Sequence, residues 1–244
     1  MKGKLFTLGI GLVVLVTSLG CGLIPRVRTI TGSGNVVTRE EPITDFDRVD
    51  VSHAFHVDIS QGDTFSVVVR VDDNLVEHLE VVKRGETLKI GLEPGLTPSM
   101  QDATMEAEVT MPEMVGLELS GASHVAVTGF ESTEPLDVNL SGASRLRGEI
   151  DAGDATFDAS GASRVMLNGS ARNVSVEGSG ASQIDLSDYS VADAKVKLSG
   201  ASAATVNASG TLDVDASGAS DVYYLGSPTM GDIEMSGASS VKRK

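Results

Sequence analysis

The four-residue stretch Ser-Gly-Ala-Ser occurs seven times in this chain and constrains its fold more than any other feature. Successive copies are separated by 21, 19, 19, 20, 18 and 19 residues. A fixed period of this length indicates a repeat architecture in which each repeat packs against its neighbours. The copies begin at Ser120, Ser141, Ser160, Ser179, Ser199, Ser217 and Ser236.

Apolar and polar residues alternate on both sides of each copy. The third residue before the first serine is always apolar, the second is always polar, and apolar residues return two positions after the final serine. A period of two predicts strands with one buried face. Each repeat is therefore predicted to contain a strand, a corner of small residues, a second strand and a variable turn. The apolar positions before the corners are Leu117, Val138, Phe157, Val176, Val196, Val214 and Ile233.

These patterns predict an all-β fold, a right-handed parallel β-helix built as a solenoid of about 20-residue coils. Each strand is expected to pair with its equivalent in the next coil. Glycine allows the sharp turn at each corner, and alanine and serine are small enough to stack from coil to coil. Helical repeats do not show this alternation, and a four-stranded propeller blade needs a longer repeat.

We expect one domain over residues 32–244, with seven regular coils in 117–244. An eighth, degenerate first coil is predicted at 46–60, where Ser52-His53-Ala54-Phe55 replaces the usual corner. A terminal position would explain its degeneracy, because end repeats face solvent on one side. Residues 61–116 break the period with β-rich runs. This inserted segment is expected to pack beside or over the first coils and to close the N-terminal end.

Residues 1–21 have the features of a bacterial lipoprotein signal peptide. Lys2 and Lys4 precede an apolar stretch too short to span a membrane comfortably, and Ser18-Leu19-Gly20-Cys21 follows. Cys21 is the only cysteine, so it cannot form an internal disulfide. We predict that Cys21 is lipidated and anchors the protein to a membrane of the cell envelope, with residues 22–31 as a tether. The envelope location could be an outer membrane or the cell surface.

The formal net charge of −15 argues against nucleic acid or anionic lipid as a partner. The repeat also predicts a column of carboxylates, because acids recur two residues before the corners and would stack about 4.8 Å apart. A divalent cation could relieve the repulsion between them. The alternative, which we favour, is a solvated face under salt screening, with no metal and no cofactor. The acids are Asp50, Glu118, Asp158, Glu177, Asp215 and Glu234.

Basic residues follow the corners in the first coils. His56, His124, Arg145 and Arg164 would form a stripe if the first two coils stack. Such a stripe could bind an anionic glycan, or it could form ion pairs with acids across the corner. The sequence favours ion pairing, because pairs on a solvent-exposed face are common. A zinc site would need a third close ligand, and the sequence offers none.

Several motifs together resemble one known family. These are the opening Gly32-Ser33-Gly34-Asn35-Val36-Val37, the Phe46–Ile59 coil followed by Gln61-Gly62-Asp63, the Asp73-Asn74-Leu75 turn and the serial Ser-Gly-Ala-Ser corners. Over roughly 31–241 the chain resembles the auto-transporter adhesin head GIN domain family. The resemblance implies a right-handed parallel β-helix and an adhesin-like role. It supplies no catalytic residues.

The sequence therefore predicts a non-enzymatic, lipid-anchored envelope protein that serves as an adhesin-like or surface interaction module, with a glycan or an extracellular protein as ligand. One alternative is an envelope accessory protein that binds a protein partner through the open end of the solenoid. A polysaccharide lyase or hydrolase is less favoured, because its carboxylates would be clustered and here they are spread evenly. The corner serines lack a Gly-x-Ser-x-Gly elbow and recurring His or Asp partners, so they are not expected to be nucleophiles.

Overall fold

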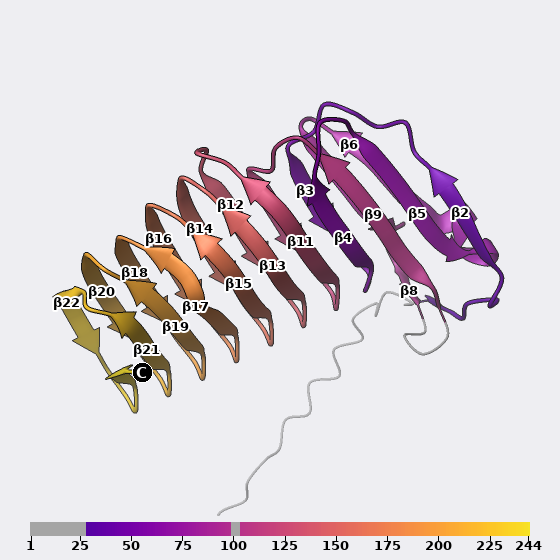
Figure 1. The fold of residues 1–244 in the computed structure, drawn as a ribbon. Helices are drawn as coiled ribbons and strands as arrows, with labels where there is room; N and C mark the ends of the chain where they lie inside the picture. Colours follow the sequence, from indigo (N-terminus) through magenta and orange to yellow (C-terminus); the bar gives the residue numbers. More distant parts are fainter. Residues whose placement is uncertain (1–27, 99–102) are drawn as a thin grey trace, which may run out of the picture.

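The protein is a β-solenoid in which two long sheets lie face to face and each coil contributes one strand to each sheet (Figure 1). The computed structural model describes residues 28–98 and 103–244. The signal peptide, Cys21 and the first part of the expected tether lie outside the described residues.

The first sheet, sheet I, has ten strands in the spatial order β22-β20-β18-β16-β14-β12-β10-β3-β7-β6. In that order they are Thr229–Met235, Thr211–Ala216, Asp193–Leu198, Asn173–Gly178, Asp154–Ala159, Leu136–Leu140, Gly116–Leu119, Arg48–Val51, Thr87–Leu92 and Leu79–Arg84. All neighbours are parallel except the β6–β7 pair, which is antiparallel.

The second sheet, sheet II, has eleven strands in the order β2-β5-β9-β4-β11-β13-β15-β17-β19-β21-β23. They are Val36–Glu40, Ser66–Asp72, Met105–Met111, His56–Gln61, His124–Glu131, Arg145–Asp151, Arg164–Ser170, Gln183–Val191, Ala203–Ala208, Asp221–Gly226 and Ser240–Arg243. Strands β1 (Arg28–Ile30) and β8 (Leu96–Pro98) form a separate parallel pair, and one 3₁₀ helix, η1, spans Asp73–His78.

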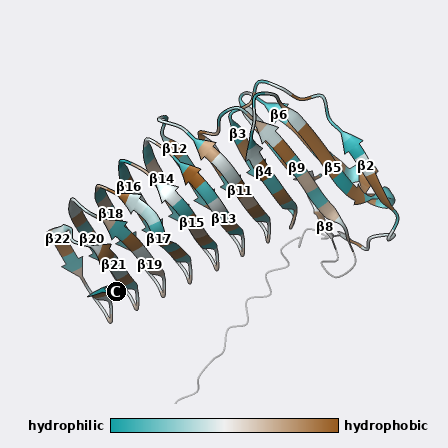
Figure 2. Ribbon diagram, viewed as in Figure 1, coloured by the Kyte–Doolittle hydropathy of each residue, from teal (hydrophilic) through white to brown (hydrophobic). Residues whose placement is uncertain are grey.

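The pairing register places equivalent residues of successive coils side by side. Leu117 pairs with Val138 in sheet I, and Val125 pairs with Leu146 in sheet II. The apolar residues of both sheets point inward and are buried, and apolar and polar residues alternate along the strands (Figure 2). Burying one Val or Leu side chain contributes about 1.5–3 kcal/mol. This core of aliphatic columns is the reason for the alternation in the sequence.

The longer repeats fit into the stack through irregularities in sheet II. The register shifts between Val127 and Phe130, in the 21-residue repeat, and between Leu186 and Ser190, in the 20-residue repeat. Extra residues are thus accommodated as bulges in one strand, and the corners stay aligned.

The inserted segment adds a coil of its own to the solenoid. Strand β7 pairs in parallel with β3, and β9 pairs in parallel with β4. Strands β2, β5 and β6 then continue the two sheets in antiparallel fashion at this end. Insertion of these strands therefore extends both sheets beyond the degenerate coil, and the next regular coil, β10–β11, stacks on its other side.

The degenerate coil is consequently internal, and the expectation that its terminal position explains its irregular corner is wrong. His53 and Ala54 at this corner both have positive φ angles, of 59° and 65°. The segment stacked outside them is the end of β7, where Leu92 N donates to His53 Nδ1 at 3.3 Å. No Ser-Gly-Ala-Ser corner lies on that side of the coil. The corner of the degenerate coil therefore does not have to bond to the glycine carbonyl of a preceding corner, as the regular corners do.

The first residues described do not form a free tether. Residues 28–30 form β1 and pair with β8, so the part of segment 22–31 that the structure describes lies against the inserted segment. None of the described helices is long and apolar enough to cross a membrane.

Candidate functional site

The repeated corners have a structural role that explains their composition. The corner glycines have φ angles between 71° and 77°, a conformation that residues with a side chain rarely adopt. The next alanine donates its N–H to the glycine carbonyl of the previous coil, as Ala181 does to Gly161 at 2.7 Å. A Cβ on Gly180 would lie 2.7 Å from the same carbonyl oxygen. A side chain at this position would therefore collide with the preceding corner at every regular corner after that of Gly121.

The last serine of each corner is also a structural residue. Ser123, Ser144, Ser163, Ser202 and Ser220 are buried, and their hydroxyls donate to the carbonyl of the first serine of the same corner at 2.7–2.9 Å. These hydroxyls close the turn, so they are occupied by backbone groups.

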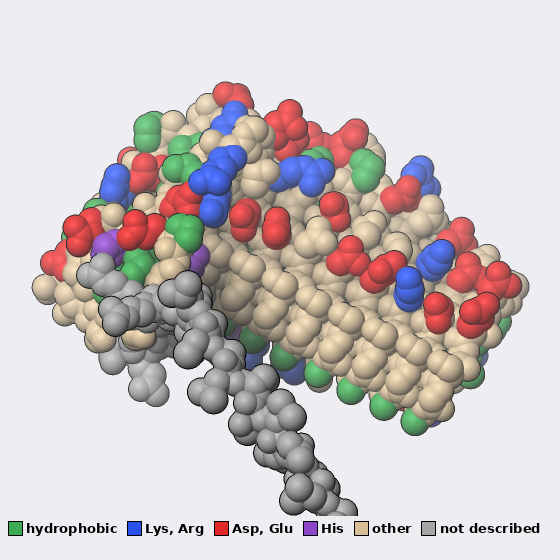
Figure 3. Space-filling model, turned by 180° about the vertical axis from the view of Figure 1, so that it is seen from behind, with side chains coloured by type: hydrophobic (Ala, Val, Ile, Leu, Met, Phe, Trp, Pro, Cys, Tyr) green, Lys and Arg blue, Asp and Glu red, His purple; other side chains and the backbone are tan. Residues whose placement is uncertain are grey.

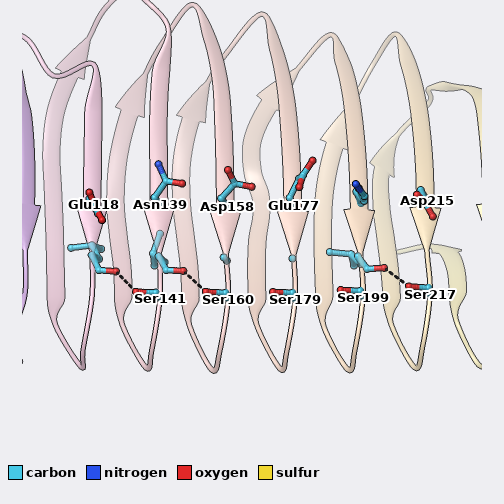
Figure 4. Close-up of a pocket in the computed structure, with 16 residues that line it drawn as sticks. Glu118, Asn139, Ser141, Asp158, Ser160, Glu177, Ser179, Ser199, Asp215 and Ser217 are labelled. Atoms are coloured by element: carbon cyan, nitrogen blue, oxygen red, sulfur yellow. Dashed lines mark hydrogen bonds between the residues drawn. The ribbon is translucent and has the colours of Figure 1, made fainter. Parts of the chain in front are cut away.

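The six predicted acids lie in one column on the outward side of sheet I. The pairing runs from Asp50 through Glu118, Asn139, Asp158, Glu177, Lys197 and Asp215 to Glu234. Between this column and the corner serines is a shallow groove of about 370 Å³ (Figure 4). Acidic side chains are spread along the face shown in Figure 3, above a flat band of small uncharged residues.

Two carboxyl groups of this acidic column are harder to ionise than usual. Burial and the neighbouring Glu118 raise the pKa of Asp50, and burial, Glu177 and Asp137 raise the pKa of Asp158. Lys89, opposite Asp50 in the register, partly offsets the first effect. No group of three or more His, Cys, Asp or Glu in 28–98 and 103–244 is arranged to hold a metal ion. The column is therefore a row of spaced carboxylates.

The predicted basic residues form a continuous surface on the outward side of sheet II. His56, His124, Arg145 and Arg164 occupy equivalent positions in β4, β11, β13 and β15. They line a hollow of about 550 Å³ together with Arg147 and Met166, which stand side by side two residues further along their strands. We call these six residues the basic trough.

The two histidines of the basic trough stack on each other. Their ring centroids are 4.7 Å apart and the planes differ by 2°. Arg145 Nη1 donates to His124 Nε2 at 3.0 Å, so this nitrogen carries no proton in the neutral ring. Burial, together with the positive charge available from His56, Arg145 and Arg147, lowers the pKa of His124 below its ordinary value of 6.5. The ring is therefore neutral at pH 7.

The expectation that the stripe forms ion pairs with acids across the corner is wrong. Arg164 donates from Nε and Nη2 to Gln183 Oε1, at 3.1 and 2.8 Å, and Arg145 contacts His124. Within the described residues, neither these two arginines nor Arg147 form an ion pair with a carboxylate. By contrast, five other arginines do: Arg39, Arg48, Arg70, Arg84 and Arg172.

Sequence reasoning missed two members of the basic trough. Arg147 and Met166 share the outward face with Arg145 and Arg164 because side chains two residues apart in a strand point the same way. Met166 is 52% exposed, which is unusual for a large apolar side chain. Extending the alternation by one step beyond each corner would have identified both.

Comparison with known proteins identifies the family. The family described as "Putative auto-transporter adhesin, head GIN domain" matches residues 45–228. The chain belongs to this family. The resemblance noted in the sequence is thereby confirmed, and the GIN domain covers the degenerate coil, the insertion and most of the regular coils.

Solved structures share the fold at low sequence identity. A "putative adhesin" from Bacteroides fragilis superposes with a TM-score of 0.80 at 20% identity, covering 88% of this chain and 100% of that one. A "putative lipid binding protein" from Parabacteroides distasonis gives 0.69 at 19% identity, covering 89% and 100%. A "putative adhesin" from Parabacteroides distasonis gives 0.68 at 17% identity, covering 88% and 100%. No curated protein is similar to this chain. At these identities the structures establish the fold alone.

Proposed function

We propose that this GIN-domain protein is a non-enzymatic, adhesin-like interaction module of the cell envelope. The observation that carries the proposal is the unbroken stacking of coils from β7 and β9 to β22 and β23. This stacking makes an extended body whose outward side chains stand in rows, one per coil. Such a body presents a long surface to a ligand, as an adhesin requires, and its family membership supports the same role.

The envelope location in this proposal rests on Cys21. A lipid on Cys21 would hold the solenoid at a membrane, and residues 28–30 would connect it to the inserted segment through the β1–β8 pair. Replacing the residue by Cys21→Ser should move the protein from the membrane fraction to the soluble fraction of the producing cell and abolish incorporation of labelled palmitate. Membrane association that survives the substitution would contradict the anchor.

Several contacts support a non-enzymatic role. The acids of the sheet I column are spread along the coils instead of clustering, and the buried hydroxyls of Ser123, Ser144, Ser163, Ser202 and Ser220 bond to carbonyls. One Ser–His contact exists, between Ser52 Oγ and His53 Nδ1 at 2.8 Å. Its histidine nitrogen also accepts the Leu92 N–H, so the contact serves to hold the degenerate corner. A lyase or hydrolase remains the less favoured candidate.

A glycan and extracellular-matrix array probed with the protein, with and without calcium, tests the proposal. Saturable binding to any arrayed ligand, without turnover, is the expected result. Binding that requires calcium would implicate the acidic column, and binding indifferent to calcium would implicate the basic trough. Depolymerisation of an arrayed polysaccharide by the purified protein would contradict the proposal.

A second candidate function is favoured by the exposed last coil. Strands β22 and β23 are the edge strands of the two sheets, and Met230 and Met235 on β22 are 42% and 53% exposed. A protein partner could add a strand there. Deleting residues 236–244 should then abolish capture of that partner, and capture by the shortened protein would exclude this mode.

A further inference from the structure

The arginines of the basic trough are held apart from the acids of a strongly acidic chain. The protein has 34 Asp and Glu against 19 Lys and Arg, so an exposed arginine has many carboxylates available to it. Arg145, Arg147 and Arg164 nevertheless form no ion pair within the described residues, whereas five arginines elsewhere do. Three guanidinium groups with unused donors on adjacent strands are suited to bind anionic groups from outside.

The residues directly beside Arg147 on the neighbouring strands carry no negative charge. Arg147 stands between Ala126 and Met166 in its row across the sheet, and neither can neutralise it. The nearest acids in that row are Asp58, beyond Ala126, and Asp185, beyond Met166. Beyond His56 stands Glu106, which is paired with Arg70 at 3.2 Å. Asp58 lines the edge of the first hollow and Asp185 lines the adjoining one, and neither forms an ion pair with Arg145, Arg147 or Arg164.

The shape of the surface indicates an elongated ligand. The hollow of about 550 Å³ falls within the roughly 300–1,000 Å³ typical of ligand pockets. A second hollow of about 440 Å³ shares Arg164 and Met166 with it and continues along sheet II past Thr205 to Tyr223. The two hollows cross the strands, so a ligand that fills both runs along the axis of the solenoid.

We propose that the basic trough binds a linear acidic polysaccharide, whose carboxylate or sulfate groups contact Arg145, Arg147 and Arg164. This proposal rests on the function proposed above and names its ligand class. Adjacent strands of a sheet are about 4.8 Å apart, so a chain lying across them meets one coil at each short step. The exposed face of Met166 and the ring of Tyr223 offer apolar surface to sugar rings between the charged contacts.

The charge distribution favours a narrow chain over a membrane surface or a nucleic acid. Charges are screened beyond about 8–10 Å at physiological salt, so a narrow chain that follows the three arginines meets only the two acids that line the hollows, Asp58 and Asp185. A bilayer or a duplex is wide enough to meet the acidic surroundings and the net charge of −15. Single-stranded nucleic acid is usually held by several stacked aromatic rings, and among Phe, Tyr and Trp the two hollows offer only Tyr223.

Surface plasmon resonance with the full-length protein captured on the sensor tests this assignment. The probes are heparin, polygalacturonate, uncharged dextran, phosphatidylglycerol vesicles and a single-stranded oligonucleotide. We expect one or both acidic glycans to bind and dextran not to bind. Binding should weaken as salt is raised from low to physiological concentration, because the contacts are ionic.

The decisive variant is the double substitution Arg145→Ala, Arg164→Ala, which removes charged contacts without touching the core. Its affinity for the acidic glycan should fall by about tenfold or more, since each charge-assisted hydrogen bond contributes at that level. The matched control, Arg84→Ala with Arg172→Ala, loses the same charge from ion-paired positions outside the trough. It should bind within about twofold of the wild type, on the scale of exposed charge pairs.

The outcomes separate this inference from the proposed function. Equal binding by the two double variants would overturn the assignment of the trough, although the protein would remain a glycan binder. Binding to dextran or to matrix proteins alone would overturn the acidic ligand class while leaving an adhesin-like role. Tighter binding of vesicles or the oligonucleotide would replace the glycan by that partner. Failure to bind any probe or arrayed ligand would overturn both proposals.

Discussion

The corners of the coils and the outward faces of their strands differ in how freely their residues vary. The corner has the same four residues in seven coils, but the row from His56 to Asp221 on sheet II changes from basic to neutral to acidic. Backbone geometry explains the first pattern, because each corner must bond to the one before it. No backbone bond constrains the outward side chains. In this solenoid the repeated residues maintain the fold, and the residues that depart from the repeat are free to form a binding surface.

A glycine substitution at a corner should produce the largest effect. Gly180→Ala combines a side chain at φ +73° with a Cβ only 2.7 Å from the Gly161 carbonyl oxygen. Positive φ costs about 1–2 kcal/mol and the overlap adds a similar amount, so the free energy of unfolding should fall by about 3 kcal/mol. Urea denaturation followed by circular dichroism measures the change.

Gly85→Ala is the control for that prediction. Gly85 has φ +63° and nothing within 4 Å of the position of a Cβ, so only the backbone cost applies. Its loss should be about 1–2 kcal/mol. Equal losses at Gly85 and Gly180 would show that the stacking of the corners imposes no steric requirement.

The buried serine of a corner should give the next largest effect. Ser163→Ala removes the hydroxyl that donates to Ser160 O at 2.7 Å, so stability should fall by about 1 kcal/mol. Ser179, the first serine of its corner, is exposed, and Ser179→Ala should change stability by less than about 0.5 kcal/mol. A larger loss at the exposed serine would mean that the corner hydroxyls have been assigned the wrong roles.

Substitutions on the outward faces should change properties that depend on pH, because these side chains carry charge and do not pack in the core. The ring of His124 faces His56 from β4 and Arg145 and Arg147 from β13, and its lowered pKa leaves it neutral at pH 7. A bound polyanion favours the protonated ring, so acidic-glycan affinity should rise as the pH falls through and below 6.5. Between pH 7 and pH 5 we expect a gain of about threefold from His124.

His124→Asn should remove this gain, and His78→Asn should leave it unchanged. His78 lies outside the trough, where its Nδ1 is 2.8 Å from Glu93. Affinities measured by surface plasmon resonance at several pH values decide the matter. A pH dependence that is the same in both variants would exclude His124 as its source.

The smallest effect concerns the acidic column. Asp158 has a raised pKa, so its ionisation costs more in the folded than in the unfolded protein, and the cost is fully present at neutral pH. Asp158→Asn should therefore increase stability at pH 7 by less than about 1 kcal/mol, the scale of exposed charge interactions. The gain should disappear as the pH falls through the raised pKa toward 3.8.

Asp154→Asn should have the opposite sign. The hydrogen-bonded Arg172 lowers the pKa of Asp154, so this carboxylate stabilises the folded state at neutral pH, and the contribution is lost as the pH falls. Thermal denaturation at pH 7 and pH 4 distinguishes the two. A loss of stability in Asp158→Asn at pH 7 would indicate that the column is a favourable arrangement, as a bound cation would make it.

The coils could be predicted from the sequence because their interactions are local in the repeat. The alternation around Ser160 fixes which residues point inward, and the spacing to Ser179 fixes which residue lies above which. The same argument placed His56 beside His124 and Arg145 beside Arg164 in the stripe. Period and alternation suffice wherever each coil contacts only the coils next to it.

The position of the inserted strands and the hydrogen bonds of the basic trough depend on contacts that the repeat period does not determine. The pairing of β7 with β3 joins segments separated by an irregular stretch, so the sequence could not show on which side of the degenerate coil they would meet. Hydrogen bonding in the trough was missed for another reason. Long arginine side chains can reach several partners, and only the structure shows that Arg164 contacts Gln183 instead of a carboxylate.

The internal position of the degenerate coil has a consequence for biosynthesis. Both neighbours of this coil, β7–β9 on one side and β10–β11 on the other, come from later in the chain. We therefore expect this coil to close only after more than fifty further residues have emerged during synthesis or export, and its closure to be slower than the addition of later coils, because its contacts are non-local. Each later coil needs only its own 18 to 21 residues and a preceding coil that is already folded. The late closure of the first segment thus sets the N-terminal end apart from the coils that follow it, which can fold from local contacts alone.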